Sequence, residues 1–272
     1  MNTFAKKQIH ISPLLALSII MLICSLASCE GAFDWVYDKA PAQERPAPVQ
    51  DQIYLDASDW KTWYYFDLPS AAASIKTDSL HDASQDIVAM SIPLEATGET
   101  ETERGDHQHS GQYLYYFDVF NEGITNNHFV SYTPTASQPS PESWTIAIHR
   151  NNVRTNGCAA YETVHTDINQ PTHADAEAIT RWQEDQWSEK EVWDDQSTML
   201  SSHVPSQGIK INPVLSSWLQ INIPPMPPTY MHNNHVMLLR LPDGTYGALQ
   251  LTDYLSPTNK KCCLTIKYKY PL

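Results

Sequence analysis

The stretch Cys262–Leu272, CCLTIKYKYPL, decides the fold class of this 272-residue chain. Every second residue along it is apolar: Cys262, Leu264, Ile266, Tyr268 and Tyr270. A threonine and two lysines lie between them. This period of two predicts a strand with one face on a core and the other in water, as in an antiparallel sheet.

The preceding stretch, His235–Tyr254 (HVMLLRLPDGTYGALQLTDY), supplies candidate partner strands. Two apolar runs flank Pro242-Asp243-Gly244, and residues of these types favour tight turns, so the stretch predicts a β-hairpin. Three further stretches carry strand-like runs of aromatic and β-branched residues: Gln112–Phe120, His128–Thr133 and Trp144–Thr155. We therefore expect an all-β, mostly antiparallel fold.

Two polar stretches between these strands, residues 95–112 and 131–143, are predicted to be long loops. Residues 174–193 are ambiguous. Their early Asp and Glu residues suit the start of a helix, whereas their three tryptophans suit strands. Both interpretations stay open.

The N-terminal residues have the pattern of an export signal. Lys6 and Lys7 precede an apolar run, Leu14–Cys24, which small residues follow. The signal ends in LASC (Leu26–Cys29), which resembles the lipobox of bacterial lipoproteins. In such proteins cleavage leaves the cysteine as a lipid-carrying N-terminus, so we expect Cys29 to hold the protein on a membrane. Ordinary secretory cleavage beside an incidental cysteine is the alternative.

The predicted organisation follows from this signal. Residues 1–28 form the signal peptide, residues 29–50 form an Ala- and Pro-rich tether that begins with lipidated Cys29, and residues 51–272 form one β domain.

Composition excludes several function classes. The 17 Lys and Arg residues face 31 Asp and Glu residues, and a net charge of −14 disfavours nucleic-acid binding. No nucleophile elbow, phosphate-binding loop, dinucleotide fingerprint or HExxH motif occurs, so we expect a binding protein and not an enzyme. The domain cysteines, Cys158, Cys262 and Cys263, are expected to be buried free thiols, with at most one of the adjacent pair facing the core. A bridge from Cys158 to one of them is the alternative.

Histidines give no strong metal signal. His107 and His109 are close enough for a surface metal site, but two solvated loop histidines are the favoured interpretation. His149 follows an apolar strand and is expected to be structural. His232 and His235 flank two asparagines just before a strand, where turn chemistry is favoured over a ligand role.

A resemblance rests on four stretches, which are Tyr54–Leu68 (YLDASDWKTWYYFDL), Trp144–Gly157 (WTIAIHRNNVRTNG), Asn212–Tyr230 (NPVLSSWLQINIPPMPPTY) and His235–Leu272 with its TDY and KYPL motifs. Together they resemble the HmuY family of haem-binding lipoproteins from Gram-negative Bacteroidetes. Residues 68–143 are longer than in the best-known members, and residues 174–206 match weakly. The resemblance implies an all-β, HmuY-like domain, non-covalent binding of haem b and attachment to the outer membrane.

The family holds haem iron between two axial side chains, and in one branch both are histidines. The second histidine position falls at or near Ile223, so the chain is more like the branch with methionine ligands. Met226, in Ile221–Tyr230 (INIPPMPPTY), is the natural replacement. A thioether can bind haem iron, and the flanking prolines would stiffen the loop. A methionine packed under a turn is the alternative.

The resemblance places the partner ligand within Trp193–Val204 (WDDQSTMLSSHV). Met199 is the expected partner, and His203 is the runner-up. Met231 and Met237 are alternatives, although Met237 lies in a predicted core strand. The residues expected to flank the porphyrin are Tyr230, Trp193 and Trp218.

The function that the resemblance implies is capture of haem and its transfer to a TonB-dependent outer-membrane transporter. The expected partners are haem, that transporter and host haem proteins, and the expected location is the outer membrane, with the cell surface favoured over the periplasmic face. The alternative is a surface lipoprotein that binds glycan or protein and has lost the haem site.

Overall fold

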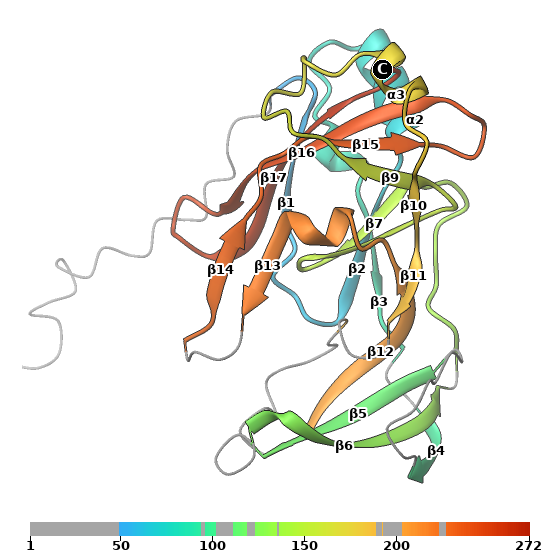
Figure 1. Ribbon diagram of the computed structural model, residues 1–272, viewed down its shortest axis with the longest axis vertical. Helices are drawn as coiled ribbons and strands as arrows, with labels where there is room; N and C mark the ends of the chain where they lie inside the picture. The colour runs from blue at the N-terminus through green and yellow to red at the C-terminus, as the bar shows by residue number, and fades with distance from the viewer. Residues whose placement is uncertain are drawn as a thin grey trace, which may run out of the picture. The chain divides into compact units, whose positions relative to one another are not determined.

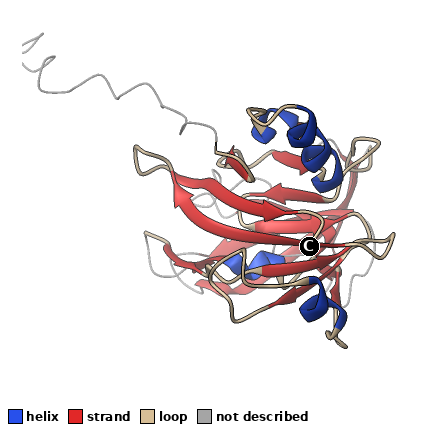
Figure 2. Cartoon of the chain, turned by 90° about the horizontal axis from the view of Figure 1, so that it is seen from above, coloured by secondary structure: helices blue, strands red, loops and turns tan. Residues whose placement is uncertain are grey.

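The computed structural model describes residues 49–93, 96–101, 111–118, 123–134, 136–188, 192, 203–222 and 227–272. These residues all belong to one unit, Arg45–Leu272. Strands make up most of the regular structure, and the helices are short (Figure 2). Every strand pair in the described part of the chain is antiparallel, so the predicted all-β, antiparallel fold is confirmed.

The largest sheet is built around the stretch that predicted the fold class, in the order β1–β17–β16–β15–β9–β10 (Figure 1). Its strands are β1 (Gln52–Asp56), β9 (Ala159–Glu162), β10 (Gln183–Glu184), β15 (Met237–Arg240), β16 (Tyr246–Leu255) and β17 (Lys261–Lys269). The predicted hairpin joins β15 to β16. Its turn contains Gly244 with a φ of 85°, a conformation that glycine adopts without strain.

Strand β17 shows the predicted alternation over its second half. The fully buried residues there are Leu264, Ile266 and Tyr268. Cys262 and Cys263 depart from it, because both are fully buried. Cys262 has a φ of 63°, and the register between β16 and β17 shifts nearby. Such an irregularity re-aims a side chain. Burial of both thiols does not decide which face each one is on, so the expectation that at most one of them faces the core stays a prediction.

Three smaller sheets complete the described fold. The four-stranded sheet contains β3 (Val88–Ser91), β2 (Thr62–Phe66), β7 (Ile146–His149) and β8 (Asn152–Thr155), in that order. The five-stranded sheet contains β11 (Gln186–Ser188), β12 (His203–Ile211), β5 (Gly111–Asp118), β6 (Gly123–Pro134) and β4 (Ala96–Glu101). Strands β13 (Leu219–Asn222) and β14 (Thr229–His232) form a separate pair. Strand β4 corrects the prediction that residues 95–112 are all loop.

The main core lies between the six-stranded and four-stranded sheets. Phe66 of β2 and Tyr268 of β17 meet edge to face, with ring centroids 5.4 Å apart. Ile146 and Ile148 of β7 belong to the same cluster, as does Trp218. Burial of such large apolar side chains is the main force that holds the two sheets together.

The helices are few, and one was not expected from the sequence. Helix α2 (Leu68–Thr77) has a proline near its start and an alanine-rich first half, which are signals that favour a helix. Helix α3 (His173–Glu177) begins one residue before the ambiguous region and continues into it, and β10 and β11 follow there, so that region contains both structures. The described residues also form two 3₁₀ turns, η1 (Ala83–Asp86) and η3 (Leu215–Trp218).

Candidate functional site

The β13–β14 hairpin carries the loop that the sequence singled out. Its four residue pairs run from Leu219 opposite His232 to Asn222 opposite Thr229. The connecting residues, 223–228, contain Met226, which lies outside the described residues. A two-stranded hairpin is marginally stable by itself, so the contacts at its base decide where the loop is held.

Tyr230 fixes one face of the hairpin to the six-stranded sheet. Its ring stacks on Tyr254 of β16, with centroids 5.7 Å apart and planes 7° apart. The ammonium nitrogen of Lys261 lies 4.1 Å from the centroid of the Tyr230 ring. Burial raises the pKa of the Tyr230 phenol, and a hydrogen bond from Arg150 acts in the opposite direction. The aromatic ring is therefore held by a stacking contact and a cation–π contact.

Two hydrogen bonds hold the base of the same hairpin. His232 Nε2 donates to the carbonyl oxygen of Leu251 at 2.7 Å, which connects β14 to β16. The amide of Asn233 donates to the carbonyl oxygen of Trp218 at 2.8 Å and closes the hairpin below its last pair. These bonds explain His232 as a structural residue.

Arg150 joins the hairpin to two other loops. It lies in the turn between β7 and β8 with a φ of 56°, and only 7% of the residue is exposed. Its guanidinium carbon lies 3.5 Å from the centroid of the Trp60 ring, and Nη1 donates to the carbonyl oxygen of Ser58 at 2.6 Å. Together with its hydrogen bond to Tyr230, these contacts place Arg150 at the junction of three loops.

The neighbouring histidine is structural, as the sequence predicted. His149 is fully buried, and its Nε2 donates to the carbonyl oxygen of Trp60 at 2.6 Å. Burial lowers the pKa of His149 to about 4. His149 is therefore neutral near neutral pH.

Arg154 plays a similar structural part further along β8. Its guanidinium carbon lies 5.0 to 5.2 Å from the ring centroids of Trp63, Tyr65 and Trp144, and it donates a hydrogen bond to the Tyr65 hydroxyl. Burial lowers the pKa of Arg154. The HR and VR motifs of the Trp144–Gly157 stretch thus serve packing between loops and strands.

Most of the residues that are predicted to ligate iron lie outside the part of the chain that the structure describes. Met199 and Met226 are not among the described residues, nor are Trp193, Cys29, His107 and His109. The backbone of His203 is described at the first position of β12, opposite Tyr116 of β5. The roles predicted for these residues stay predictions.

The predicted porphyrin-flanking residues that are described both have other surroundings. Trp218 is 0% exposed and belongs to the main core, so its ring offers no surface to a ligand in this conformation. Tyr230 contacts Tyr254 and Lys261 through its ring. In the described structure Trp218 thus packs in the core and Tyr230 holds the hairpin to the sheet, and their predicted place beside a porphyrin stays a prediction.

The two alternative methionines differ sharply in exposure. Met237 is 0% exposed and lies in the main core, as its strand pattern predicted. Met231 is 59% exposed on β14, opposite Gln220 of β13. It is an exposed thioether on the hairpin that carries Met226.

Sequence reasoning missed the residues that hold this hairpin. Tyr254 and Arg150 lie in the TDY and HR motifs that carried the family resemblance, and Lys261 follows the β16–β17 turn. Their placement beside the β13–β14 hairpin could not be inferred from spacing. No other signal in the sequence brings these three segments together.

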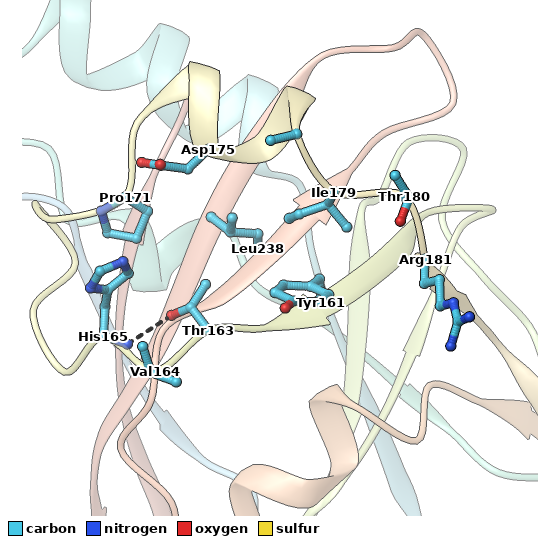
Figure 3. A pocket seen from close by; sticks show the side chains of 11 residues that line it. Tyr161, Thr163, Val164, His165, Pro171, Asp175, Ile179, Thr180, Arg181 and Leu238 are labelled. Carbon is cyan, nitrogen blue, oxygen red and sulfur yellow. Dashed lines mark hydrogen bonds between the residues drawn. The ribbon is translucent and has the colours of Figure 1, made fainter.

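A pocket lies beside β9 and β15 and is lined in part by the first residues of the ambiguous region (Figure 3). Its volume is about 490 Å³, and its lining includes Tyr161, Val164, Leu238 and Arg181. None of the predicted site residues lines it. The sequence offered no motif for this pocket, because its lining comes from β9, β15 and the segment around α3.

The described residues contain neither a metal-binding cluster nor a membrane-spanning helix. No group of three or more His, Cys, Asp or Glu side chains gathers there in a way that could hold a metal ion. No described helix combines the length and apolar character that are needed to cross a membrane. The described cysteines of the domain, Cys158, Cys262 and Cys263, are buried and free, which confirms the favoured prediction.

Comparison with solved structures shows a shared fold. A protein from Bacteroides vulgatus, described as HmuY-like and haem-binding, is 27% identical, with a TM-score of 0.55 over 81% of this chain and 91% of that chain. A protein from Bacteroides fragilis, described as a lipoprotein, is 23% identical, with a TM-score of 0.54 over 81% and 89% of the two chains. The apo form of a HmuY analogue from Tannerella forsythia is 18% identical, with a TM-score of 0.55 over 81% and 95%. At these identities the last two show the fold alone.

Comparison at the level of sequence gives the family. No curated protein matched the sequence of this chain. A family model described as HmuY protein matches residues 59–268, which is well over half of the chain. The match includes the four-stranded sheet, the hairpin and most of β17. The chain therefore belongs to the HmuY family.

Proposed function

We propose that this protein binds haem b non-covalently, with the iron held by side chains of the β13–β14 hairpin loop and of the segment before β12. The observation that carries the proposal is the match of residues 59–268 to the HmuY family. The similar protein from Bacteroides vulgatus is described as haem-binding, which supports the same ligand.

The donor chemistry of the hairpin fits haem iron. The loop at its end contains Met226 between prolines, and the exposed Met231 follows on β14. Thioethers are soft ligands that bind haem iron and favour its reduced state. Because Tyr230, His232 and Arg150 fix the base of the hairpin, the loop can be held in place before haem arrives, which reduces the ordering cost of binding.

The proposed axial pair is Met226 and Met199, with His203 as the runner-up for the second position. Met199 and His203 both lie at the entry to β12 in sequence. When bound, the haem supplies an iron centre and a large apolar plane. The protein would gain affinity by burying that plane and orientation from the two axial bonds.

The physiological role that we propose is haem capture at the cell surface. Lipidated Cys29 would anchor the protein to the outer membrane, and residues 29–50 would hold the domain away from it. Haem taken from host haem proteins would pass to a TonB-dependent transporter. This role is binding and transfer without catalysis, in keeping with the absence of catalytic motifs in the sequence.

An absorbance titration tests the proposal. The mature chain is titrated with haem b in the oxidised state and, under anaerobic conditions, in the reduced state. We expect saturation at one haem per chain and tighter binding of reduced haem. A featureless titration, with the spectrum of free haem throughout, would overturn the proposed function.

A second measurement tests transfer. The haem-loaded protein is mixed with outer-membrane vesicles that carry a TonB-dependent haem transporter, and the loss of its visible spectrum is followed. We expect loss to be faster than with vesicles that lack the transporter. Equal rates would contradict the proposed delivery and leave haem binding standing.

A further inference from the structure

The pocket beside β9 and β15 has the size of a small-molecule site. Its volume is about 490 Å³, within the range of about 300–1,000 Å³ that such sites occupy. It shares no lining residue with the β13–β14 hairpin. The pocket is therefore a candidate binding site separate from the proposed haem site.

The middle of the pocket is apolar. Figure 3 shows Leu238, Ile179 and Tyr161 between its two ends, and Val164 lies at its lower edge. Leu238 of β15 is opposite Tyr161 of β9 in the sheet register, and it is 1% exposed. Tyr161 and Val164 are 40% and 84% exposed, which are large values for side chains of their kind. Large apolar side chains that are exposed together mark an interaction site more often than isolated ones do.

The walls are fixed before any ligand binds. The Tyr161 ring meets the edge of Trp182 with centroids 6.4 Å apart, and Trp182 stacks on Tyr246 at 5.8 Å. Thr163 donates through its hydroxyl to the carbonyl oxygen of Val236 at 2.8 Å and accepts from the amide of His165 at 3.1 Å. A preformed wall lowers the cost of binding.

The two ends of the pocket carry opposite charges (Figure 3). Asp175 lies at one end, and its carboxylate already accepts hydrogen bonds from the amide and hydroxyl of Thr172, at 2.8 and 2.7 Å. Those hydrogen bonds hold the pKa of Asp175 below its usual range. This carboxylate therefore remains charged, and its Thr172 partners already balance part of that charge.

Arg181 lies at the other end, next to Thr180. Within the described part of the chain, no acceptor faces its guanidinium group and no ion pair involves it. In a chain with a net charge of −14, this cation gives its end of the pocket a local preference for an anion.

We propose that this pocket binds a small amphipathic carboxylate. Its apolar body would lie against Tyr161, Val164 and Leu238, and its carboxylate would meet Arg181. Asp175 repels a carboxylate from the opposite end, so the two charges select one orientation. Arg181 suits this task because guanidinium pairs with a carboxylate through two parallel hydrogen bonds.

Three probes of equal chain length separate the contribution of the apolar body from that of the carboxylate. Octanoate, 1-octanol and octylammonium are titrated into the full chain by calorimetry. We expect octanoate to bind about tenfold more tightly than either of the others, the effect of one hydrogen-bonded ion pair.

The Arg181→Gln variant should lose that preference, and Val164→Asp should weaken octanoate binding because it adds a second carboxylate to the apolar part. The matched control is Lys76→Gln, which removes an exposed cation from α2 and should change nothing.

Four outcomes would overturn the proposal. These are no detectable binding of octanoate, equal affinity for the three probes, tighter binding of octylammonium, and equal effects of Arg181→Gln and Lys76→Gln. A final titration uses protein saturated with haem. Unchanged octanoate affinity there supports a separate site, whereas competition would assign octanoate to the haem site and contradict the inference.

Discussion

Tyr230 of β14 stacks on Tyr254 of β16 with ring planes only 7° apart. This contact connects the short hairpin that carries Met226 to the large sheet at the centre of the fold. The ammonium group of Lys261 also lies against the Tyr230 ring. The hairpin that carries the proposed ligand loop is thus held by residues that lie 24 and 31 positions after Tyr230 in the chain.

The first prediction concerns Tyr230. Changing Tyr230→Ala removes the stack, which contributes about 1 kcal/mol beyond the area that it buries, and should loosen the hairpin. In the haem complex we expect faster haem dissociation and an altered visible spectrum, since the ligand loop is less well held. Tyr230→Phe keeps the ring and should retain the wild-type spectrum.

A variant of the stacking partner shows whether Tyr230 acts by positioning the hairpin or by touching haem directly. Tyr254→Ala removes the same stack from the opposite side, and it should reproduce the effect of Tyr230→Ala. Wild-type spectra and dissociation rates in both alanine variants would show that the stack does not position the loop.

The strands were the most predictable part of the fold. The alternation from Leu264 to Tyr268 and the Pro-Asp-Gly turn are local signals, and local signals decide strand faces and hairpins. Cys262 and Cys263 were not predictable in the same way, because the irregular backbone at Cys262 depends on its partner strand. Helix α2 was missed although its proline and alanines were visible, since the surrounding strand signals are stronger.

The second prediction concerns His149 and pH. Its folded-state pKa of about 4 lies below the ordinary value of 6.5 because the ring is buried. Between these two values the unfolded chain binds more protons than the folded one, so stability falls as pH falls. Above pH 6.5 His149 is neutral in both states and does not lower the free energy of unfolding. As the pH falls from 6.5 to 4, His149 lowers the free energy of unfolding by about 3 kcal/mol.

Denaturant unfolding at pH 7.5, 5.5 and 4.5 measures this effect. His149→Gln retains an N–H donor for the Trp60 carbonyl but cannot titrate, so its stability should fall less between pH 7.5 and 4.5 than that of the wild type. His173→Gln, at an exposed position on α3, is the control and should follow the wild type. If all three proteins lose the same stability, His149 does not carry this pH dependence.

The third prediction concerns the thiols. Burial raises the pKa of Cys158 to about 12 and also raises the pKa values of Cys262 and Cys263. Since the thiolate is the reactive form, none of the three should react with iodoacetamide in the native protein at pH 8. All three should be modified after unfolding in denaturant, as mapped by mass spectrometry. Rapid native labelling of the Cys158 peptide would contradict the burial that the structure gives it.

The candidate site was less predictable than the fold. The proline-flanked Met226 is visible in one short stretch, but the contacts that hold its hairpin come from the HR turn, β16 and β17. Proximity in sequence predicts porphyrin contact for Trp218, which stays a prediction, but it gives no sign that this ring is completely buried in the folded chain. Which residues flank a site is decided by packing between distant segments, and a single sequence does not display that packing.

The fourth prediction concerns the anchor. Cys29→Ala should abolish metabolic labelling with a fatty acid and release the protein from membranes, because no acyl chain could then be attached. Cys24→Ala, a few residues earlier in the apolar run, is the matched control and should be labelled normally. Persistent labelling of Cys29→Ala would exclude lipidation at this residue.

The last prediction concerns the axial ligands. Thioether ligation raises the reduction potential of haem, so a pair formed by Met226 and Met199 should bind reduced haem more tightly than oxidised haem. Met226→Ala should weaken binding of reduced haem and change the spectrum of the complex, while the fold survives, since a loop side chain contributes little to the core. Met199→Ala should have the same effect, and the exposed Met231→Ala should have none. If His203→Ala changes the spectrum and Met199→Ala does not, the second ligand is His203. Unchanged affinities and spectra in Met226→Ala would remove this residue from the site, and an effect of Met231→Ala in its place would move the ligand from the loop to β14.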